Sequence, residues 1–172
     1  MIYLIRHGEP DYSQQNTKIY QGYGVNLSPL STKGIEQIKE TSNDIRLKNV
    51  DIILSSPYTR ALQTAAILSK TLNVDIAVET DLHEWIANKD YIYEVDKGAI
   101  DAYREYTENK GEYPLDTEKS WETASLIRSR VMPVLEKYKH LDKVIVACHG
   151  TLIQALTGEH MPKHGEIVEF EL

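Results

Sequence analysis

The sequence is poor in cysteine and has no long apolar stretch. Its 172 residues include a single cysteine, Cys148, so an intramolecular disulfide is impossible and a reducing compartment is expected. No apolar run approaches the roughly 20 residues that a membrane-spanning helix needs. Arg6 also interrupts the N-terminus before an apolar stretch long enough for a signal peptide can form. We therefore predict a cytoplasmic protein.

Positive charge is scarce too, because 19 lysines and arginines stand against 26 aspartates and glutamates and give a formal net charge of -7. Such a protein is a poor ligand for nucleic acid or an anionic membrane, and neither is predicted as a partner. Any anion must therefore bind in a local basic pocket. The chain has 41% hydrophobic and 26% charged residues, which is typical of a soluble protein, and its length suits one domain, 1–172. Nothing in the sequence indicates an oligomeric state.

A convincing metal-binding motif is missing as well. His160 and His164 have a spacing that metal ligands on a helix can use. Pro162 and Gly165, however, argue against one continuous helix that presents both side chains. The sequence therefore predicts no metal site and no other cofactor.

The sequence does contain an apolar N-terminal run that stops abruptly at a cation and an imidazole. Residues 1–5 are rich in β-formers and lead into Arg6-His7-Gly8, which predicts a buried strand that ends in a turn. Arginine grips phosphate oxygens in a bidentate fork, and histidine can act as nucleophile or proton carrier near neutral pH. The pattern favours a phosphate site with a nucleophile inside it. A basic surface turn is the alternative for this tripeptide taken alone.

Strand-like and helix-like segments alternate along the rest of the chain. Further strands are predicted at 50–55, 74–79 and 143–148, with a half-exposed edge strand at 166–172. Helices are predicted from Ser31, from Ser56-Pro57, over 121–138 and just after His149. This order predicts an α/β fold with a mostly parallel sheet, helices on both faces and an antiparallel edge strand.

Candidate functional residues follow the ends of the predicted parallel strands. Arg6-His7, Arg60, Glu84 and His149 come after the first, second, third and fourth strands in turn. Singly, they have ordinary explanations as a surface arginine, a solvated carboxylate or a core histidine. Ligands of open parallel sheets bind beyond the carboxyl ends of the strands. The joint placement of these residues at one sheet edge therefore predicts an active site.

The stretch 85–120 is the least regular part of the chain, and it is acidic and rich in tyrosine. We interpret it as a lid insertion that folds over the strand ends. The alternative is an irregular surface excursion whose tyrosines pack for stability. Tyrosines in a lid would suit a substrate with an apolar or ring-shaped body.

Several pieces of the sequence resemble the histidine phosphatase superfamily, which also contains the cofactor-dependent phosphoglycerate mutases. They are Arg6-His7-Gly8-Glu9 and the segments 21–22, 28–34, 55–61, 63–65, 82–84 and 148–150, in the family's order. Each piece is weak, but the ordered set is specific and spans most of the chain. The resemblance implies a phosphoglycerate mutase-like α/β fold, a covalent phosphohistidine intermediate and no metal.

The resemblance also implies a role for each candidate catalytic residue. His7 would be the nucleophile, and Glu84 would donate a proton to the leaving group. Arg6, Arg60 and His149 would hold the phosphoryl oxygens. These roles agree with the chemistry that the residue types suggest on their own.

Substrate contacts are predicted from the polar loop after the first strand and from the start of the last helix. The family often has a Trp-Asn pair soon after its signature, where this chain reads Asp11-Tyr12-Ser13, and Asn16 is the candidate for the place of the asparagine. Gln21, Gly22 and Thr151 complete the predicted substrate-binding set. A solvated connection is the alternative for the loop.

We favour a phosphomonoester hydrolase acting on a small phosphorylated metabolite. A phosphoglycerate mutase is the first alternative, but it needs cations for a carboxylate and a second phosphate. The lid offers few beyond Lys89, Lys97 and Arg104. An inactive phosphate sensor or interaction module is the second alternative, and it is disfavoured because no group that the chemistry requires is missing.

Overall fold

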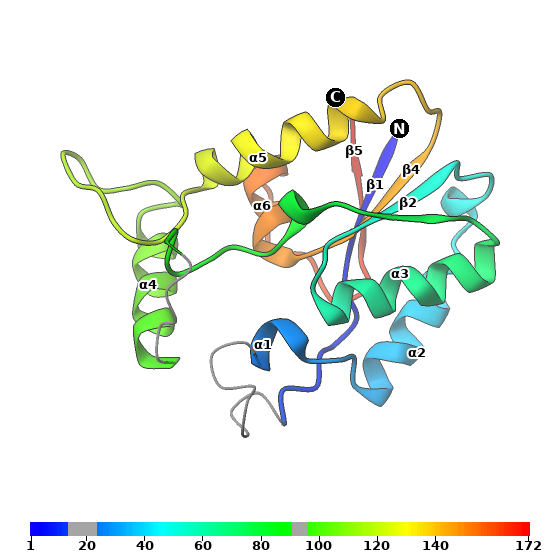
Figure 1. The fold of residues 1–172 in the computed structure, drawn as a ribbon, viewed down its shortest axis with the longest axis horizontal. Helices are drawn as coiled ribbons and strands as arrows, with labels where there is room; N and C mark the ends of the chain where they lie inside the picture. Colours follow the sequence, from blue (N-terminus) through cyan, green and yellow to red (C-terminus); the bar gives the residue numbers. More distant parts are fainter. Residues whose placement is uncertain (14–23, 91–95) are drawn as a thin grey trace.

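Strands in the order β3-β2-β4-β1-β5 form the sheet of this computed structural model, which describes residues 1–13, 24–90 and 96–172 (Figure 1). The strands are β1 (Ile2–Arg6), β2 (Ile52–Ser55), β3 (Ile76–Val78), β4 (Val144–Cys148) and β5 (Ile167–Phe170). The first four are mutually parallel, whereas β5 pairs antiparallel with β1. The predicted α/β fold, with its mostly parallel sheet and antiparallel edge strand, is confirmed.

Helices cover both faces of this sheet. They are α1 (Gly24–Leu27), α2 (Thr32–Thr41), α3 (Thr59–Leu72), α4 (Asp96–Glu108), α5 (Ala124–Lys137) and α6 (Gly150–Thr157). Alternation along β1 explains the arrangement, since successive side chains of a strand point to opposite faces. Tyr3 and Ile5 pack in one core cluster with residues of α2 and α3, and Ile2 and Leu4 pack in another with residues of α5 and α6. None of the helices in the described ranges is long and apolar enough to cross a membrane.

Side-chain caps fix the starts of two helices. The Ser31 hydroxyl oxygen accepts a hydrogen bond from the Gly34 N–H (3.0 Å) and caps α2 as predicted. The Thr123 hydroxyl oxygen accepts one from the Leu126 N–H (3.1 Å) and caps α5. The predicted helix 121–138 therefore begins later, at Ala124. Both caps satisfy backbone donors that a helix start leaves without partners.

Helix α3 also begins later than predicted. The sequence placed its cap at Ser56 and its first position at Pro57, but the helix starts at Thr59 without a side-chain cap. The Ser56 hydroxyl oxygen accepts a hydrogen bond from the Tyr58 N–H (3.2 Å) and lies 2.8 Å from His149 Nε2. Ser56 therefore stabilises a turn and contacts a histidine instead of capping the helix.

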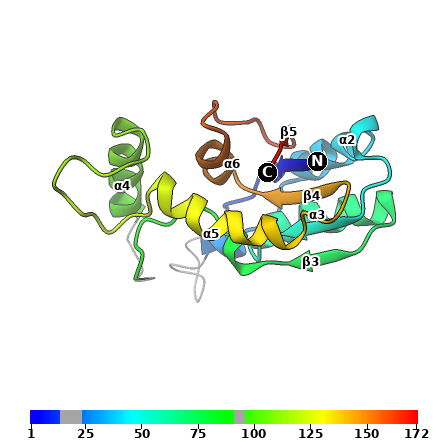
Figure 2. The same cartoon turned by 90° about the horizontal axis from the view of Figure 1, so that it is seen from above.

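The segment 85–120 contains α4, which lies beyond the end of the sheet, beside the start of α5 (Figure 2). Its aromatic side chains pack on one another. The ring of Tyr106 meets the ring of Trp121 edge-on at 5.6 Å, and both side chains are buried. The Tyr113 hydroxyl donates a hydrogen bond to the Trp121 carbonyl (2.7 Å). These tyrosines therefore extend the core that α5 forms with the sheet.

Candidate active site

The carboxyl edge of the parallel strands carries the residues predicted to be catalytic. Arg6 ends β1 and His7 follows it, Arg60 lies in the first turn of α3 after β2, and His149 joins β4 to α6. Glu84 follows β3 and the short turn at Thr80–Leu82. The His7 and His149 rings are 5.2 Å apart between centroids. The structure thus brings together the residues that the sequence assigned to one site.

His7 is held as a neutral imidazole whose unprotonated nitrogen faces Arg60. Its Nδ1 lies 2.7 Å from the Gly8 carbonyl oxygen, which can only accept a hydrogen bond, so Nδ1 carries the proton. Its Nε2 accepts a hydrogen bond from Arg60 Nε (3.1 Å). Burial of the ring and then the charge of Arg60 lower the pKa of His7 to about 3. The lone pair on Nε2 is therefore available at neutral pH.

The turn that carries His7 needs two glycines. A Cβ at Gly8 would collide with the backbone of Gly34, and a Cβ at Gly34 would collide with the backbone of Glu9. The Ser31 N–H also donates a hydrogen bond to the Glu9 carbonyl (2.8 Å). This close backbone contact ties the turn after His7 to the start of α2, and it explains why both Gly8 and Gly34 are glycines.

The guanidinium groups of Arg6 and Arg60 supply the local positive charge that an anion site needs in a protein of net negative charge. Arg60 is 3% exposed, and its Nη1 donates to the Val25 carbonyl (2.8 Å). Arg6 Nη1 donates to the Pro162 carbonyl (2.6 Å). The Nε of Arg6 is buried and has no hydrogen-bond partner among the described residues. A Cβ at position 150 would crowd this guanidinium, so Gly150 leaves room for it.

His149 is fully buried and offers a second donor without a partner. Its Nε2 lies 2.8 Å from Ser56 Oγ, and its Nδ1 has no partner in the described part of the chain. Burial, reinforced by Arg60, lowers the pKa of His149 well below its ordinary value. When the Ser56 hydroxyl donates to Nε2, Nδ1 carries the proton and remains a free donor. Buried donors without partners are costly unless an anion satisfies them.

Glu84 sits against the N-terminus of α6. One carboxyl oxygen accepts hydrogen bonds from the N–H groups of Trp85 (2.9 Å) and Leu152 (3.2 Å), and the other accepts one from the Thr151 N–H (3.4 Å). Burial raises the pKa of Glu84, against the opposing effect of these bonds and of Arg60. A raised pKa suits a proton donor. The Thr151 backbone therefore contacts the candidate acid.

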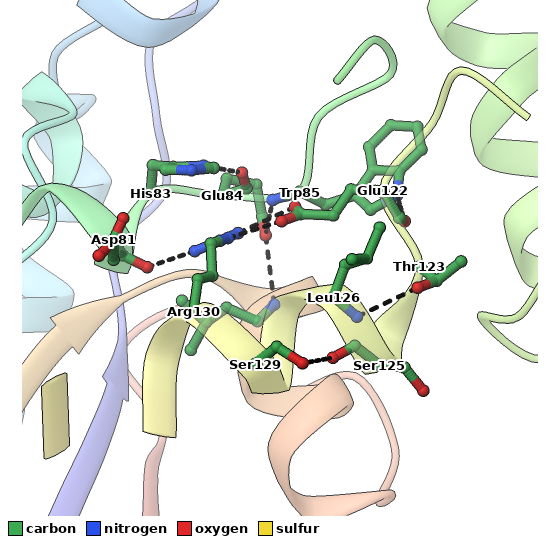
Figure 3. A network of polar contacts seen from close by, with 11 residues as sticks. Asp81, His83, Glu84, Trp85, Glu122, Thr123, Ser125, Leu126, Ser129 and Arg130 are labelled. Atoms are coloured by element: carbon green, nitrogen blue, oxygen red, sulfur yellow. Dashed lines mark hydrogen bonds and ion pairs between the residues drawn. The ribbon is translucent and has the colours of Figure 1, made fainter. Parts of the chain in front are cut away.

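A buried ion pair holds the segment around Glu84, and sequence reasoning had not assigned it to the site (Figure 3). Arg130 of α5 donates to both carboxylate oxygens of Glu122 (2.6 and 2.9 Å), and these side chains are 14% and 7% exposed. Arg130 also donates to the Asp81 carbonyl, and the Glu122 carbonyl accepts from Trp85 Nε1 (2.7 Å). The pair thus fixes the chain on both sides of Glu84. The signal in the sequence was weak, because the family often has Gly-Glu-Ser before this helix and this chain departs from it with Trp121-Glu122-Thr123.

Sequence reasoning also missed His164 as a neighbour of the site. Its ring centroid lies 5.5 Å from that of His7. From the sequence, His164 was considered only as a metal ligand together with His160. Among the described residues, no group of three histidine, cysteine or acidic side chains is arranged to hold a metal ion. The predicted substrate-binding residues Asn16, Gln21 and Gly22 lie outside the described residues.

Known proteins share this sequence pattern. The sequence profile of the histidine phosphatase superfamily (branch 1) matches residues 2–168. The chain is 30% identical over 161 residues to the uncharacterized phosphatase PhoE of Bacillus subtilis, an alignment that spans 92% of this chain and 76% of that protein. It is 30% identical over 83 residues to the probable phosphoglycerate mutase GpmB of Enterobacter sp., across 48% of this chain and 37% of that protein.

The fold is shared with solved structures as well. A mycobacterial glucosyl-3-phosphoglycerate phosphatase with VO3 superposes with a TM-score of 0.71 over 96% of this chain and 88% of that chain. At 19% identity, this likeness bears on the fold alone. The profile match covers nearly the whole sequence, and the matched motifs meet at one sheet edge. The chain therefore belongs to the histidine phosphatase superfamily, branch 1.

Proposed function

We propose that this protein is a phosphomonoester hydrolase that acts through a phosphohistidine at His7 on a small phosphorylated metabolite. One observation carries the proposal. His7 Nδ1 is bonded to the Gly8 carbonyl, which leaves the lone pair of the ring on Nε2, beside the guanidinium of Arg60. A neutral imidazole oriented by its own backbone and facing a cation is what attack on a phosphate dianion requires.

In the first step, the phosphoryl group binds among Arg6, Arg60 and His149. Arg6 Nε and His149 Nδ1, which have no partner among the described residues, meet its nonbridging oxygens, and the Arg60 guanidinium adds positive charge. His7 Nε2 attacks phosphorus in line with the leaving oxygen, so a P–N bond forms as the P–O bond breaks. Glu84, whose pKa is raised by burial, gives its proton to the leaving oxygen.

In the second step, a water molecule resolves the phosphohistidine. The Glu84 carboxylate takes a proton from that water, and the water oxygen attacks phosphorus as the P–N bond breaks. Inorganic phosphate leaves, His7 regains its lone pair, and Glu84 is protonated again. No proton or electron pair is left over, so the proposed cycle needs no co-reactant beyond water.

The segment 85–120 borders this site in the proposal and acts as its lid. Tyr103 of α4 stacks on Tyr106 with the ring centroids 6.0 Å apart. The ring of Tyr103 also meets the Trp85 ring edge-on at 5.4 Å, and Trp85 directly follows Glu84. An aromatic wall beside the leaving-group acid fits a substrate with an apolar or ring-shaped body.

The cations of the same segment favour hydrolysis over mutase activity. Lys89 is already paired with Glu118 (2.9 Å), and Arg104 is paired with Asp101 (2.7 Å). Neither is poised to grip the carboxylate or the second phosphate of a bisphosphoglycerate, which leaves Lys97, an exposed residue of α4, as the remaining one of the three cations. The likeness to GpmB is the observation that keeps a mutase as the second candidate.

Replacing His7 with Ala tests the proposal. We expect the variant to lose turnover of an aryl phosphate and to form no acid-labile phosphoenzyme when the substrate carries labelled phosphate, because the acceptor nitrogen is gone. His140→Ala removes an exposed histidine at the end of α5 and is expected to behave as wild type. Given a bisphosphorylated glycerate as primer, the wild-type enzyme should release inorganic phosphate and not isomerise phosphoglycerates. Turnover that survives in the His7 variant would refute the mechanism.

A further inference from the structure

The loop between α6 and β5 is hydrogen-bonded to the residue that precedes the nucleophile. The Gly165 N–H donates to the Arg6 carbonyl (2.9 Å), and the Arg6 N–H donates to the Glu166 carbonyl (3.3 Å). The Arg6 side chain donates to the Pro162 carbonyl of the same loop (2.6 Å). Gly165 has a φ of +77°, a conformation that favours glycine. His164 therefore occupies a fixed position beside Arg6 and His7.

The ring of His164 lies close to the nucleophile and makes no hydrogen bond to any described residue. Its centroid is 5.5 Å from that of His7, with the planes tilted by 38°. His149 contacts the same His7 ring at 5.2 Å, so the nucleophile has an imidazole neighbour in each of two different loops. His164 also lines an open cavity of about 830 Å³ with Gln37 and Lys163. The imidazole is therefore half-buried and can exchange protons with water.

Charged groups from four parts of the chain face His164. Arg6 at the end of β1, Lys33 of α2 and Arg60 of α3 are cations, and Glu9 is an anion that Lys33 holds at 2.7 Å. Burial and then the charge of Arg6 lower the pKa of His164. The imidazole is therefore neutral in the free protein, where another cation beside two guanidinium groups would be unfavourable.

A bound phosphate dianion would reverse this balance. It carries up to two negative charges and lies against His7, on which the His164 ring packs. An opposite charge within about 4–6 Å favours the protonated form of an imidazole. The His164 imidazole is therefore disfavoured in its protonated form when the site is empty and favoured in that form when phosphate fills the site.

We propose that His164 is a further phosphoryl-binding residue, which takes up a proton when the phosphate dianion binds and donates a charged hydrogen bond to it. This inference rests on the proposed function, because it requires the phosphoryl group to sit at His7. A lysine in this place would repel the two arginines permanently, whereas an imidazole adds its charge only together with the anion. Proton uptake and phosphate binding are thereby coupled, and each strengthens the other.

The affinity for inorganic phosphate, measured by calorimetry in wild type and His164→Gln at pH 6, 7 and 8, tests this coupling. Both proteins see the same ionisation of free phosphate at each pH, so the ratio of their affinities isolates the imidazole. We expect wild type to bind phosphate about fivefold or more tightly than the variant at pH 6, which is the lower end of typical coupling between sites. The ratio should approach one at pH 8. His160→Gln, on the same loop with a side chain that is 74% exposed, should match wild type throughout.

Ring ¹⁵N spectra of histidine-labelled wild-type protein test the inference without a substitution. With His164→Gln assigning the signal, the His164 ring should change from neutral to imidazolium at pH 7 as inorganic phosphate saturates the site. A ring that stays neutral, or an affinity ratio of one at pH 6, would overturn the role of His164. If His164→Gln still forms the His7 phosphoenzyme, either result would leave the proposed phosphatase mechanism standing. Loss of the phosphoenzyme in wild type would instead overturn both.

Discussion

Burial shifts the pKa values of two residues of this site, His7 and Glu84, in opposite directions. Burial penalises the charged form of each group, so it lowers the pKa of His7 and raises the pKa of Glu84. The histidine is thus kept as the free base that a nucleophile must be, and the carboxyl is pushed toward the protonated form that an acid must be. The charge of Arg60 also lowers the pKa of His7, second only to burial. In the case of Glu84, the same charge opposes the rise in pKa that burial causes.

Replacing Glu84 with Gln should separate good leaving groups from poor ones. A poor leaving group needs the proton, so its kcat should fall by about 10²–10⁴-fold, the range for general acid catalysis. An aryl phosphate with an acidic phenol needs it less and should be much less affected. Asp81→Asn, which changes an exposed carboxylate on the same segment, is the matched control. Equal losses for both classes of substrate would remove Glu84 from the role of acid.

The residues that follow strands were predictable from the sequence, and His164 was not, for a physical reason. Arg6, His7 and His149 each stand directly after an apolar run, so the strand itself fixes where they lie. His164 lies in an irregular loop, and its place depends on hydrogen bonds between that loop and Arg6. Such contacts produce no periodic pattern of apolar residues from which the sequence could predict them. The same holds for Ser56, whose hydroxyl faces His149 and not the helix that it was expected to cap.

At the scale of elements, α5 positions the candidate acid although it carries no catalytic group. Glu84 stands in a segment without regular structure, between the short turn at Thr80–Leu82 and the segment 85–120. The ion pair of Arg130 with Glu122 holds this segment from both sides, through the Asp81 carbonyl and Trp85 (Figure 3). The sequence predicted the helix, but it could not show that one arginine on that helix would reach the loop after β3.

Glu122→Gln should weaken the site through Glu84. The substitution leaves a mostly buried guanidinium without its anion, and breaking such a pair costs about 3–5 kcal/mol of unfolding free energy. In the folded variant, kcat for poor leaving groups should fall while KM changes little, since Arg6 and Arg60, the proposed phosphoryl-binding residues, are untouched. Glu112→Gln breaks the ion pair with Arg128, in which each side chain is 45% exposed. This change should lower the free energy of unfolding by less than about 1 kcal/mol. An unchanged preference for leaving groups in Glu122→Gln would show that the pair serves stability alone.

At the scale of the whole molecule, an acidic chain concentrates its buried cations and imidazoles at one sheet edge. The order of segments was enough to predict that edge, because parallel strands joined by helices leave their carboxyl ends on the same side. The packing of 85–120 was less predictable. Its tyrosines fit both interpretations made from the sequence: Tyr106 is buried in the core, and both Tyr103 and Tyr106 contact Trp85, which directly follows Glu84. Composition alone cannot tell which tyrosines pack in the core and which border the site.

The buried imidazoles should make the folded state sensitive to mild acid. The pKa values of His7, His83 and His149 are all lowered in the folded protein, whereas in the unfolded chain they return to about 6.5. The unfolded state therefore binds more protons below pH 6.5, and stability is lost as the pH falls from there toward the folded-state values. The raised pKa of Glu84 acts in the opposite sense, because its contribution is greatest at low pH and is lost as the pH rises, so it offsets part of the loss.

We accordingly expect the free energy of unfolding, measured with urea, to fall between pH 6 and pH 5, because three imidazoles take up protons on unfolding whereas Glu84 acts in the opposite sense. His7, whose folded-state pKa is about 3, alone contributes a fall of about 1.4 kcal/mol per pH unit. His149→Gln removes one of the three imidazoles and should make the fall shallower. His140→Gln, at an exposed position, should leave the slope as it is. A stability that stays level from pH 7 to pH 5 in wild type and also in Glu84→Gln, which lacks the opposing carboxyl, would mean that these rings are already charged in the folded protein. The neutral His7 on which the nucleophilic mechanism depends would then be excluded as well.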